Sequence, residues 1–141
     1  MHTNPPDDTL RQILTEARTI AMIGASSNPD RPSYAIMKLL LDVGFTVFPV
    51  NPKETEILGQ RAYPALRDIP VRVDIVDVFR KSEDTPAIAD EAVAIGAKVL
   101  WLQAGVTSED AAARATAGGL TVIMDRCIGA TFRLLGVPPK G

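Results

Sequence analysis

Apolar residues fall into two alternating patterns along this chain. Short runs that are almost entirely apolar predict strands buried on both faces, as in a parallel sheet. These runs are residues 19–23, 45–50, 73–79, 98–102 and 120–124. Between the second and third runs, residues 51–70 are rich in turn residues and predict one helical turn at 64–67.

Apolar residues at helical spacing precede, separate and follow the strands. The first predicted helix has Asp7 or Asp8 as its N-cap. The other predicted helices cover residues 33–43, 85–95, 107–117 and 130–135. In the fourth helix, Thr107 and Asp110 form a capping pattern, and the buried face is expected to be mostly alanine.

Alternating strands and helices indicate the α/β class. We expect a Rossmann-like, doubly wound parallel sheet of about five strands with helices on both faces. With 141 residues and no break in composition, the chain is expected to form one domain over 1–141, with flexible residues 1–8 and a tail at 137–141. In such a sheet, ligands bind beyond the carboxyl ends of the strands, where the chain order reverses.

The loop at residues 24–33 joins the first strand to a helix and has the character of a phosphate site. Free backbone N–H groups and the helix dipole favour an anion there. Of the dinucleotide fingerprint G-x-G-x-x-G only Gly24 is present, since Ser26 and Pro29 take the other glycine places, and no lysine follows as in a Walker loop. A side chain at Gly24 is expected to block a diphosphate without unfolding the protein. The alternative is a plain turn capped by Ser33, but loops of this kind usually have only about two to six residues.

The residues after the second strand restrict the nucleotide. An NAD site favours an acidic residue there to hold the ribose hydroxyls, whereas this chain has Asn51, Pro52 and Lys53. A ligand with an additional phosphate is therefore expected. NADP, with its 2′-phosphate, and coenzyme A, with its 3′-phosphate, both meet this requirement.

Composition argues against several classes of partner. The chain has 15 basic and 17 acidic residues and a formal net charge of −2, without a basic run, so neither nucleic acid nor a membrane surface is expected as a partner. It has one cysteine, no signal peptide pattern and no apolar run of membrane-spanning length. We expect a cytoplasmic protein.

Five motifs resemble those of a known family in their order and spacing. They are GASSNPDRPS at 24–33, VNP at 50–52, VDIVDVFR at 73–80, WLQAGV at 101–106 and MDRC at 124–127. Together they resemble the CoA-binding domain superfamily, in particular the small stand-alone bacterial proteins named after YccU. The resemblance covers residues 10–136 and extends to the N-terminal part of the succinyl-CoA synthetase α subunit.

The resemblance implies coenzyme A or an acyl-CoA as the ligand. The diphosphate would lie over residues 24–28, Lys53 near the ribose phosphate, Val78 to Arg80 around the adenosine, and residues 103–106 under the pantetheine arm. The full set of candidate binding residues is Gly24, Ala25, Ser26, Ser27, Asn28, Arg31, Ser33, Tyr34, Asn51, Pro52, Lys53, Val78, Phe79, Arg80, Gln103, Gly105, Val106, Arg126 and Cys127.

No catalytic constellation or metal site is predicted. Many relatives continue after Arg-Cys with Ile-Lys-Ile-Glu-His, whereas residues 128–132 here read IGATF, and the sole histidine is His2. Asp74 and Asp77 would point to opposite faces of their strand, so one of them is expected to be a partnered structural carboxylate. We expect a non-catalytic carrier, sensor or regulatory protein. The alternatives are an NADP(H)-binding reductase or redox sensor, or an accessory subunit of an acyl-CoA enzyme; a homo-oligomer is also possible.

Four residues keep two readings each. Arg126 either pairs with Asp125 or meets a ligand phosphate. Trp101 either stacks on an adenine or, as we expect, lies in the core, and Tyr34 either reaches the ligand or packs over the loop. Cys127 either is an inert core residue or forms a mixed disulfide with the thiol of coenzyme A.

Overall fold

A parallel sheet of five strands forms the centre of the molecule in the computed structural model, which describes residues 1–140. Its strands lie in the order β2-β1-β5-β6-β7. In chain order they are β1 (Thr19–Ile23), β2 (Thr46–Val50), β5 (Ile75–Val78), β6 (Val99–Leu102) and β7 (Thr121–Ile123). The predicted fold class is therefore confirmed.

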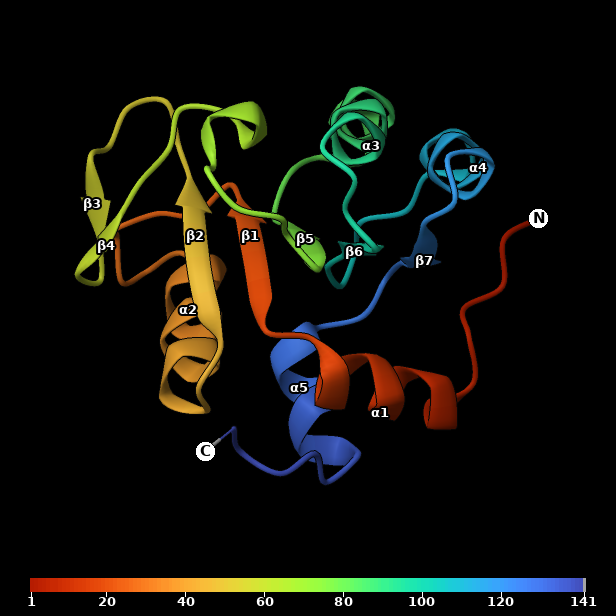
Figure 1. The fold of residues 1–141 in the computed structure, drawn as a ribbon, viewed down its shortest axis with the longest axis horizontal. Coiled ribbons are helices and arrows are strands. Elements are labelled where there is room, and N and C mark those ends of the chain that lie inside the picture. The colour runs from red at the N-terminus through yellow and green to blue at the C-terminus, as the bar shows by residue number, and fades with distance from the viewer. Residues whose placement is uncertain (141) are drawn as a thin grey trace.

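Helices cover both faces of this sheet (Figure 1). On one face lie α1 (Asp7–Glu16), α2 (Pro32–Asp42) and α5 (Ile128–Leu134), and on the other α3 (Thr85–Ala94) and α4 (Glu109–Ala117). The turn-rich segment after β2 forms a hairpin of β3 (Glu56–Ile57) and β4 (Gln60–Arg61), followed by the short 3-10 helix η1 (Leu66–Asp68). A second short helix, η2 (Ser82–Asp84), precedes α3.

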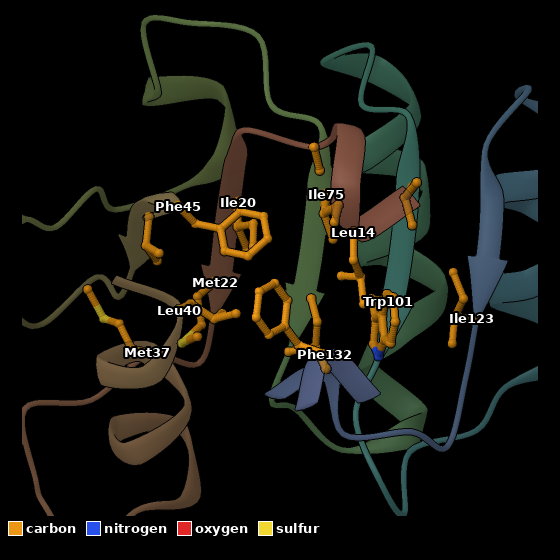
Figure 2. Close-up of a cluster of buried hydrophobic side chains, with 14 of the residues drawn as sticks. Leu14, Ile20, Met22, Met37, Leu40, Phe45, Ile75, Trp101, Ile123 and Phe132 are labelled. Carbon is orange, nitrogen blue, oxygen red and sulfur yellow. The ribbon is translucent and has the colours of Figure 1, made fainter. Parts of the chain in front are cut away.

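Two apolar clusters fix these layers to the sheet. Figure 2 shows the first, in which Leu14 of α1, Leu40 of α2 and Phe132 of α5 pack against the sheet. Trp101 is fully buried in it and donates its indole N–H to the carbonyl oxygen of Arg126 at 2.8 Å, which confirms it as a core residue. Alanines dominate the second cluster on α4, as predicted, and let α3 and α4 pack closely.

The starts of three helices differ from the predictions. No side chain caps α1, which begins directly after Pro6. Ser108, not Thr107, caps α4 by accepting a hydrogen bond from the Ala111 N–H at 3.0 Å. The last helix starts earlier than predicted, at Ile128, because Cys127 occupies its N-cap position.

The N-terminal segment lies beside β7 and is held by hydrogen bonds. The Asn4 carboxamide donates to the Met124 carbonyl at 2.8 Å and accepts from the Met124 N–H at 2.9 Å. The His2 N–H donates to Glu109 at 2.6 Å. The helix also begins at Asp7, inside the range expected to be flexible. Within residues 1–140, no helix has the length and apolar character needed to cross a membrane.

The chain order reverses between β1 and β5. From β1 the chain moves out to β2 and returns on the other side of β1 to form β5, so the loops after β1 and β5 diverge. Gly24 follows β1 with a φ of +83°, and a Cβ there would overlap the carbonyl oxygen of Phe79, which follows β5. A side chain at Gly24 thus meets the protein's own backbone, which corrects the expectation that it would affect the ligand alone.

Replacing Gly24 by alanine is expected to destabilise the fold more than a matched change at Gly59. Gly59 also has a positive φ, +76°, but a Cβ there would meet nothing within 4 Å. Gly59→Ala should cost about 1–2 kcal/mol for the left-handed backbone alone. Gly24→Ala should add roughly 1–3 kcal/mol for the overlap with Phe79. Urea unfolding of both variants measures the difference, and equal losses would show that the loops separate freely.

Candidate functional site

A cavity of about 1350 Å³ opens at the carboxyl ends of the strands. Its walls come from the segments that follow β1, β2, β5 and β6 and from Cys127 ahead of α5. This is the edge and the reversal point at which a doubly wound sheet binds its ligands. The volume exceeds the roughly 300–1,000 Å³ of an ordinary small-molecule pocket, so the cavity suits an extended ligand.

Most of the predicted binding residues line this cavity. They are Gly24, Ala25, Ser26, Arg31, Ser33, Asn51, Pro52, Lys53, Phe79, Arg80, Gln103, Val106 and Cys127. Six others do not: Ser27, Asn28, Tyr34, Val78, Gly105 and Arg126. Val78 is fully buried in the second apolar cluster, so it lies inside the sheet rather than on an adenosine wall.

Arg126 faces the N-terminal helix instead of the cavity. Its guanidinium lies 3.4 Å from the Asp7 carboxylate, and the neighbouring Asp125 accepts a hydrogen bond from the Gly105 N–H at 2.7 Å. Both earlier readings of Arg126, as the partner of Asp125 and as a phosphate contact, therefore lose support. Asp125 and Gly105 instead join the loops after β7 and β6.

The loop at residues 24–31, here called the phosphate loop, is organised by its own hydrogen bonds. The Ser26 hydroxyl accepts from the Asn28 N–H at 3.0 Å, and the Asn28 carboxamide accepts from the Asp30 N–H at 2.9 Å. Among the described residues, the N–H groups of Ala25 and Ser26 have no partner. Two backbone donors therefore remain available in the part of the phosphate loop that directly follows β1 and lines the cavity.

Asn51 and Glu54 hold this loop from the neighbouring strand. The Asn51 carboxamide donates to the Ala25 carbonyl at 2.9 Å and accepts from the Lys53 N–H at 2.8 Å. The Glu54 carboxylate accepts from the Ser27 N–H at 3.0 Å and from Asn51 at 3.3 Å. Asn51 thus both lines the cavity and fixes its neighbours. Glu54 was not predicted, because only the parallel pairing of β1 with β2 brings it beside Ser27.

Charge is distributed unevenly around the cavity. Among the described residues, the lining cations Arg31, Lys53 and Lys81 make no ion pair, whereas Arg80 pairs with Asp84 at 3.1 Å. The lining acids Glu83, Asp84 and Glu91 belong to η2 and α3. An anion is therefore favoured beside β1 and β2, away from α3. The first turn of α2 has no acidic residue that would repel such an anion.

Ser33 is not the N-cap of α2, because Arg31 occupies that position. Ser33 lies inside the first turn, lines the cavity and is only 2% exposed. Its hydroxyl has no hydrogen-bond partner among the described residues. A buried hydroxyl without a partner is costly in free energy, so this group is suited to a polar atom entering the cavity.

The cavity floor contains a buried polar network that the sequence did not predict. Gln103 donates its side-chain N–H to Asp77 on β5, and its side-chain carbonyl accepts from the Ile128 N–H at 3.4 Å. The side-chain amide of Gln103 is therefore already hydrogen-bonded within the protein. Gln103 was expected to lie under a pantetheine arm, and in the structure its side chain holds the cavity floor together. The network connects β5, the loop after β6 and the start of α5.

Asp77 and Asp74 have opposite electrostatic environments. Burial raises the pKa of Asp77 from 3.8 to about 8, although the hydrogen bond from Gln103 opposes this rise. At neutral pH Asp77 is therefore predominantly protonated, and its second oxygen has no partner among the described residues. For Asp74, burial is outweighed by the N–H groups of Arg18 and Thr19 and by Lys98, which hold its pKa below 3.8. Asp74 is thus the partnered structural carboxylate that was predicted.

Sequence reasoning also missed part of the cavity wall. Pro64, Ala65 and Leu66 line it, and they belong to the helical turn that was predicted at 64–67 but not assigned to the site. Ile36, one turn after Ser33 in α2, adds an apolar contact. The sequence provided little indication that Pro64, Ala65 and Leu66 belong to the site. The pairing of Tyr63 with Val50 brings the segment after β2 to the cavity, and local sequence does not reveal this pairing.

Together, the fold, the phosphate loop and the cavity define a nucleotide-binding α/β domain. The model of the CoA binding domain family matches residues 18–133, so the chain belongs to this family. The predicted family resemblance is thereby confirmed.

Three relatives illustrate this membership. YneT of Bacillus subtilis (strain 168) is 41% identical over 125 residues, which cover 89% of this chain and 93% of YneT. A solved structure of a hypothetical protein from Pyrococcus horikoshii OT3 has a TM-score of 0.90 and 37% identity, covering 96% of this chain and 99% of that one. The alpha subunit of ADP-forming acetate–CoA ligase I from Pyrococcus furiosus is 34% identical over 95 residues, 63% of this chain but only 21% of that subunit.

Removing the ionisable group of Asp77 is expected to change how stability depends on pH. Unfolding exposes the carboxyl, which then ionises above pH 3.8, whereas the folded carboxyl stays protonated up to about pH 8. The free energy of unfolding that Asp77 contributes therefore falls as pH rises from 3.8 to about 8, and above that pH it no longer changes. Asp77→Asn keeps an oxygen for Gln103 but cannot ionise.

Urea unfolding of the wild type and of Asp77→Asn across this pH range measures the effect. The stability of the wild type should fall relative to that of Asp77→Asn as pH rises. Parallel curves for the two proteins would show that Asp77 is ionised at neutral pH.

Proposed function

We propose that this protein binds coenzyme A or an acyl-CoA and acts as a non-catalytic carrier, sensor or regulatory protein. The single observation that carries the proposal is the phosphate loop: its Ala25 and Ser26 N–H groups have no partner within residues 1–140, and they line the same large cavity as Arg31 and Lys53, which form no ion pair within that range. Membership of the CoA binding domain family supports the same ligand.

The charges of the site fit the phosphates of coenzyme A. Its diphosphate would accept hydrogen bonds from the Ala25 and Ser26 N–H groups at the start of the phosphate loop. Its 3′-phosphate would lie near Lys53, whose side chain is exposed at the cavity and has no ion-pair partner among the described residues. The ribose would need no acidic partner after β2, where Asn51 and Pro52 stand.

The rest of the cavity fits the remainder of this ligand. Ala65 and Leu66 provide an apolar wall beside Lys53, and Ala104 and Val106 provide another after β6. The pantetheine arm would lie over the floor that Gln103 and Asp77 hold. The ionisable group of this network, Asp77, is fully buried and does not line the cavity, which favours a binding role over acid–base chemistry.

The runner-up is an NADP(H)-binding reductase or redox sensor, because Lys53 would serve a 2′-phosphate equally well. A further alternative is an accessory subunit of an acyl-CoA enzyme, given the ligase subunit among the relatives. Calorimetric titration with coenzyme A, acetyl-CoA and NADPH separates these ligands. Binding of NADPH without binding of either CoA would overturn the proposal.

Lys53→Ala is expected to weaken coenzyme A more than dephospho-CoA. The ammonium contacts the 3′-phosphate, which dephospho-CoA lacks, and a charge-assisted contact of this kind is worth about tenfold or more in affinity. Titration of both ligands into the wild type and the variant measures the difference. Lys38→Ala is the matched control, since Lys38 is an exposed lysine of α2 that pairs with Asp42 outside the cavity lining. Equal losses for both ligands would remove Lys53 from the proposed role.

A further inference from the structure

Cys127 is part of the cavity wall. It is the only cysteine of the chain, is partly exposed and lines the same cavity as the phosphate loop. Its sulfur accepts a hydrogen bond from the Ala130 N–H at 3.5 Å. Cys127 is therefore partly exposed at the cavity and is not a buried core residue.

The hydrogen bond from the Ile128 N–H to Gln103 and the packing of α5 against α2 place Cys127 beside the cavity floor, over which the pantetheine arm would lie. Gly129, two residues after Cys127, is buried, and a Cβ there would lie 3.0 Å from the Ile36 side chain of α2. The Asp77–Gln103 network holds the next residue, Ile128, by its N–H. Cys127 thus has a defined position between a fixed helix start and the cavity.

Ser33 provides independent evidence for a ligand in this part of the cavity. Its hydroxyl is buried, lines the cavity and has no partner among the described residues. Ser33 lies one helical turn before Ile36, the residue against which Gly129 packs. A polar ligand atom at Ser33 would therefore lie close to the segment that carries Cys127.

We propose that Cys127 exchanges thiols with coenzyme A disulfide bound in this cavity, which leaves coenzyme A joined to the protein as a mixed disulfide. This inference rests on the proposed coenzyme A site. It assigns a reaction to a protein whose proposed role is otherwise reversible binding, and it makes occupancy of the cavity depend on the thiol–disulfide balance of the surroundings.

The exchange is balanced without an additional oxidant. The Cys127 thiolate attacks one sulfur of coenzyme A disulfide, the disulfide bond breaks, and a new bond forms between Cys127 and one pantetheine sulfur. The other coenzyme A leaves as a thiolate and takes up the proton that Cys127 has lost. A second thiol reverses the reaction by attacking the mixed disulfide.

Intact-mass measurement after incubation with coenzyme A disulfide tests the proposal. The wild type should gain the mass of one coenzyme A moiety, and a dithiol reductant should remove it. Because the chain has one cysteine, the adduct is located on the wild type itself. Cys127→Ser, which retains an oxygen for the N-cap, should gain no mass.

Glutathione disulfide serves as a control disulfide that does not resemble a nucleotide. Binding in the cavity should make the adduct form at least about tenfold faster from coenzyme A disulfide than from glutathione disulfide. Adenosine 3′,5′-bisphosphate, which has the phosphates but no thiol, should slow only the first reaction. Equal rates for both disulfides would overturn the proposal, because Cys127 would then react without guidance from the cavity.

Calorimetric titration of coenzyme A under reducing conditions separates this inference from the proposed function. Reversible binding of coenzyme A without adduct formation from its disulfide would overturn the exchange and leave the proposed function standing. Absence of reversible binding would overturn the proposed function and, with it, the exchange.

Discussion

The site depends on the close approach of two backbones at the point where the chain order reverses. Gly24 lies so near the Phe79 carbonyl that no side chain fits between them, and its positive φ turns the chain from β1 toward α2. This contact aligns the phosphate loop with the segment after β5. The cavity opens beyond it because the two segments then diverge, one toward α2 and the other toward α3.

Local patterns in the sequence were sufficient to predict most of the sheet. The run at 19–23 coincides with β1, since a short run of apolar or β-branched residues is typical of a strand covered on both faces. The helix starts were less predictable. Thr107 and Ser108 are both good caps, and local sequence does not show that Ser108 is the one that caps α4. The β3–β4 hairpin has strands of two residues, too short to show any alternation.

The candidate site was predicted as far as it follows directly from strand ends. Gly24, Asn51, Phe79 and Gln103 each stand just beyond the strand that brings them to the cavity. The contacts between these segments were not predictable. Gln103 and Asp77 are 26 positions apart, and their hydrogen bond requires the register of β5 with β6. Val78 was misplaced for a related reason, because the side of the sheet that a strand residue faces depends on tertiary packing.

The hydrogen bonds of Asn4 have a consequence for how copies of this chain can associate. Its carboxamide occupies the N–H and the carbonyl of Met124 beyond the end of β7, so a side chain takes the place of a neighbouring strand there. At the opposite edge, Tyr63 bonds to Pro49 and Asn51 along the carboxyl half of β2. Both margins of the sheet are thus partly sealed by segments of the same molecule, which protects against edge-to-edge aggregation. Extension of the sheet by a second copy is therefore disfavoured at these two positions, where the backbone groups are already paired.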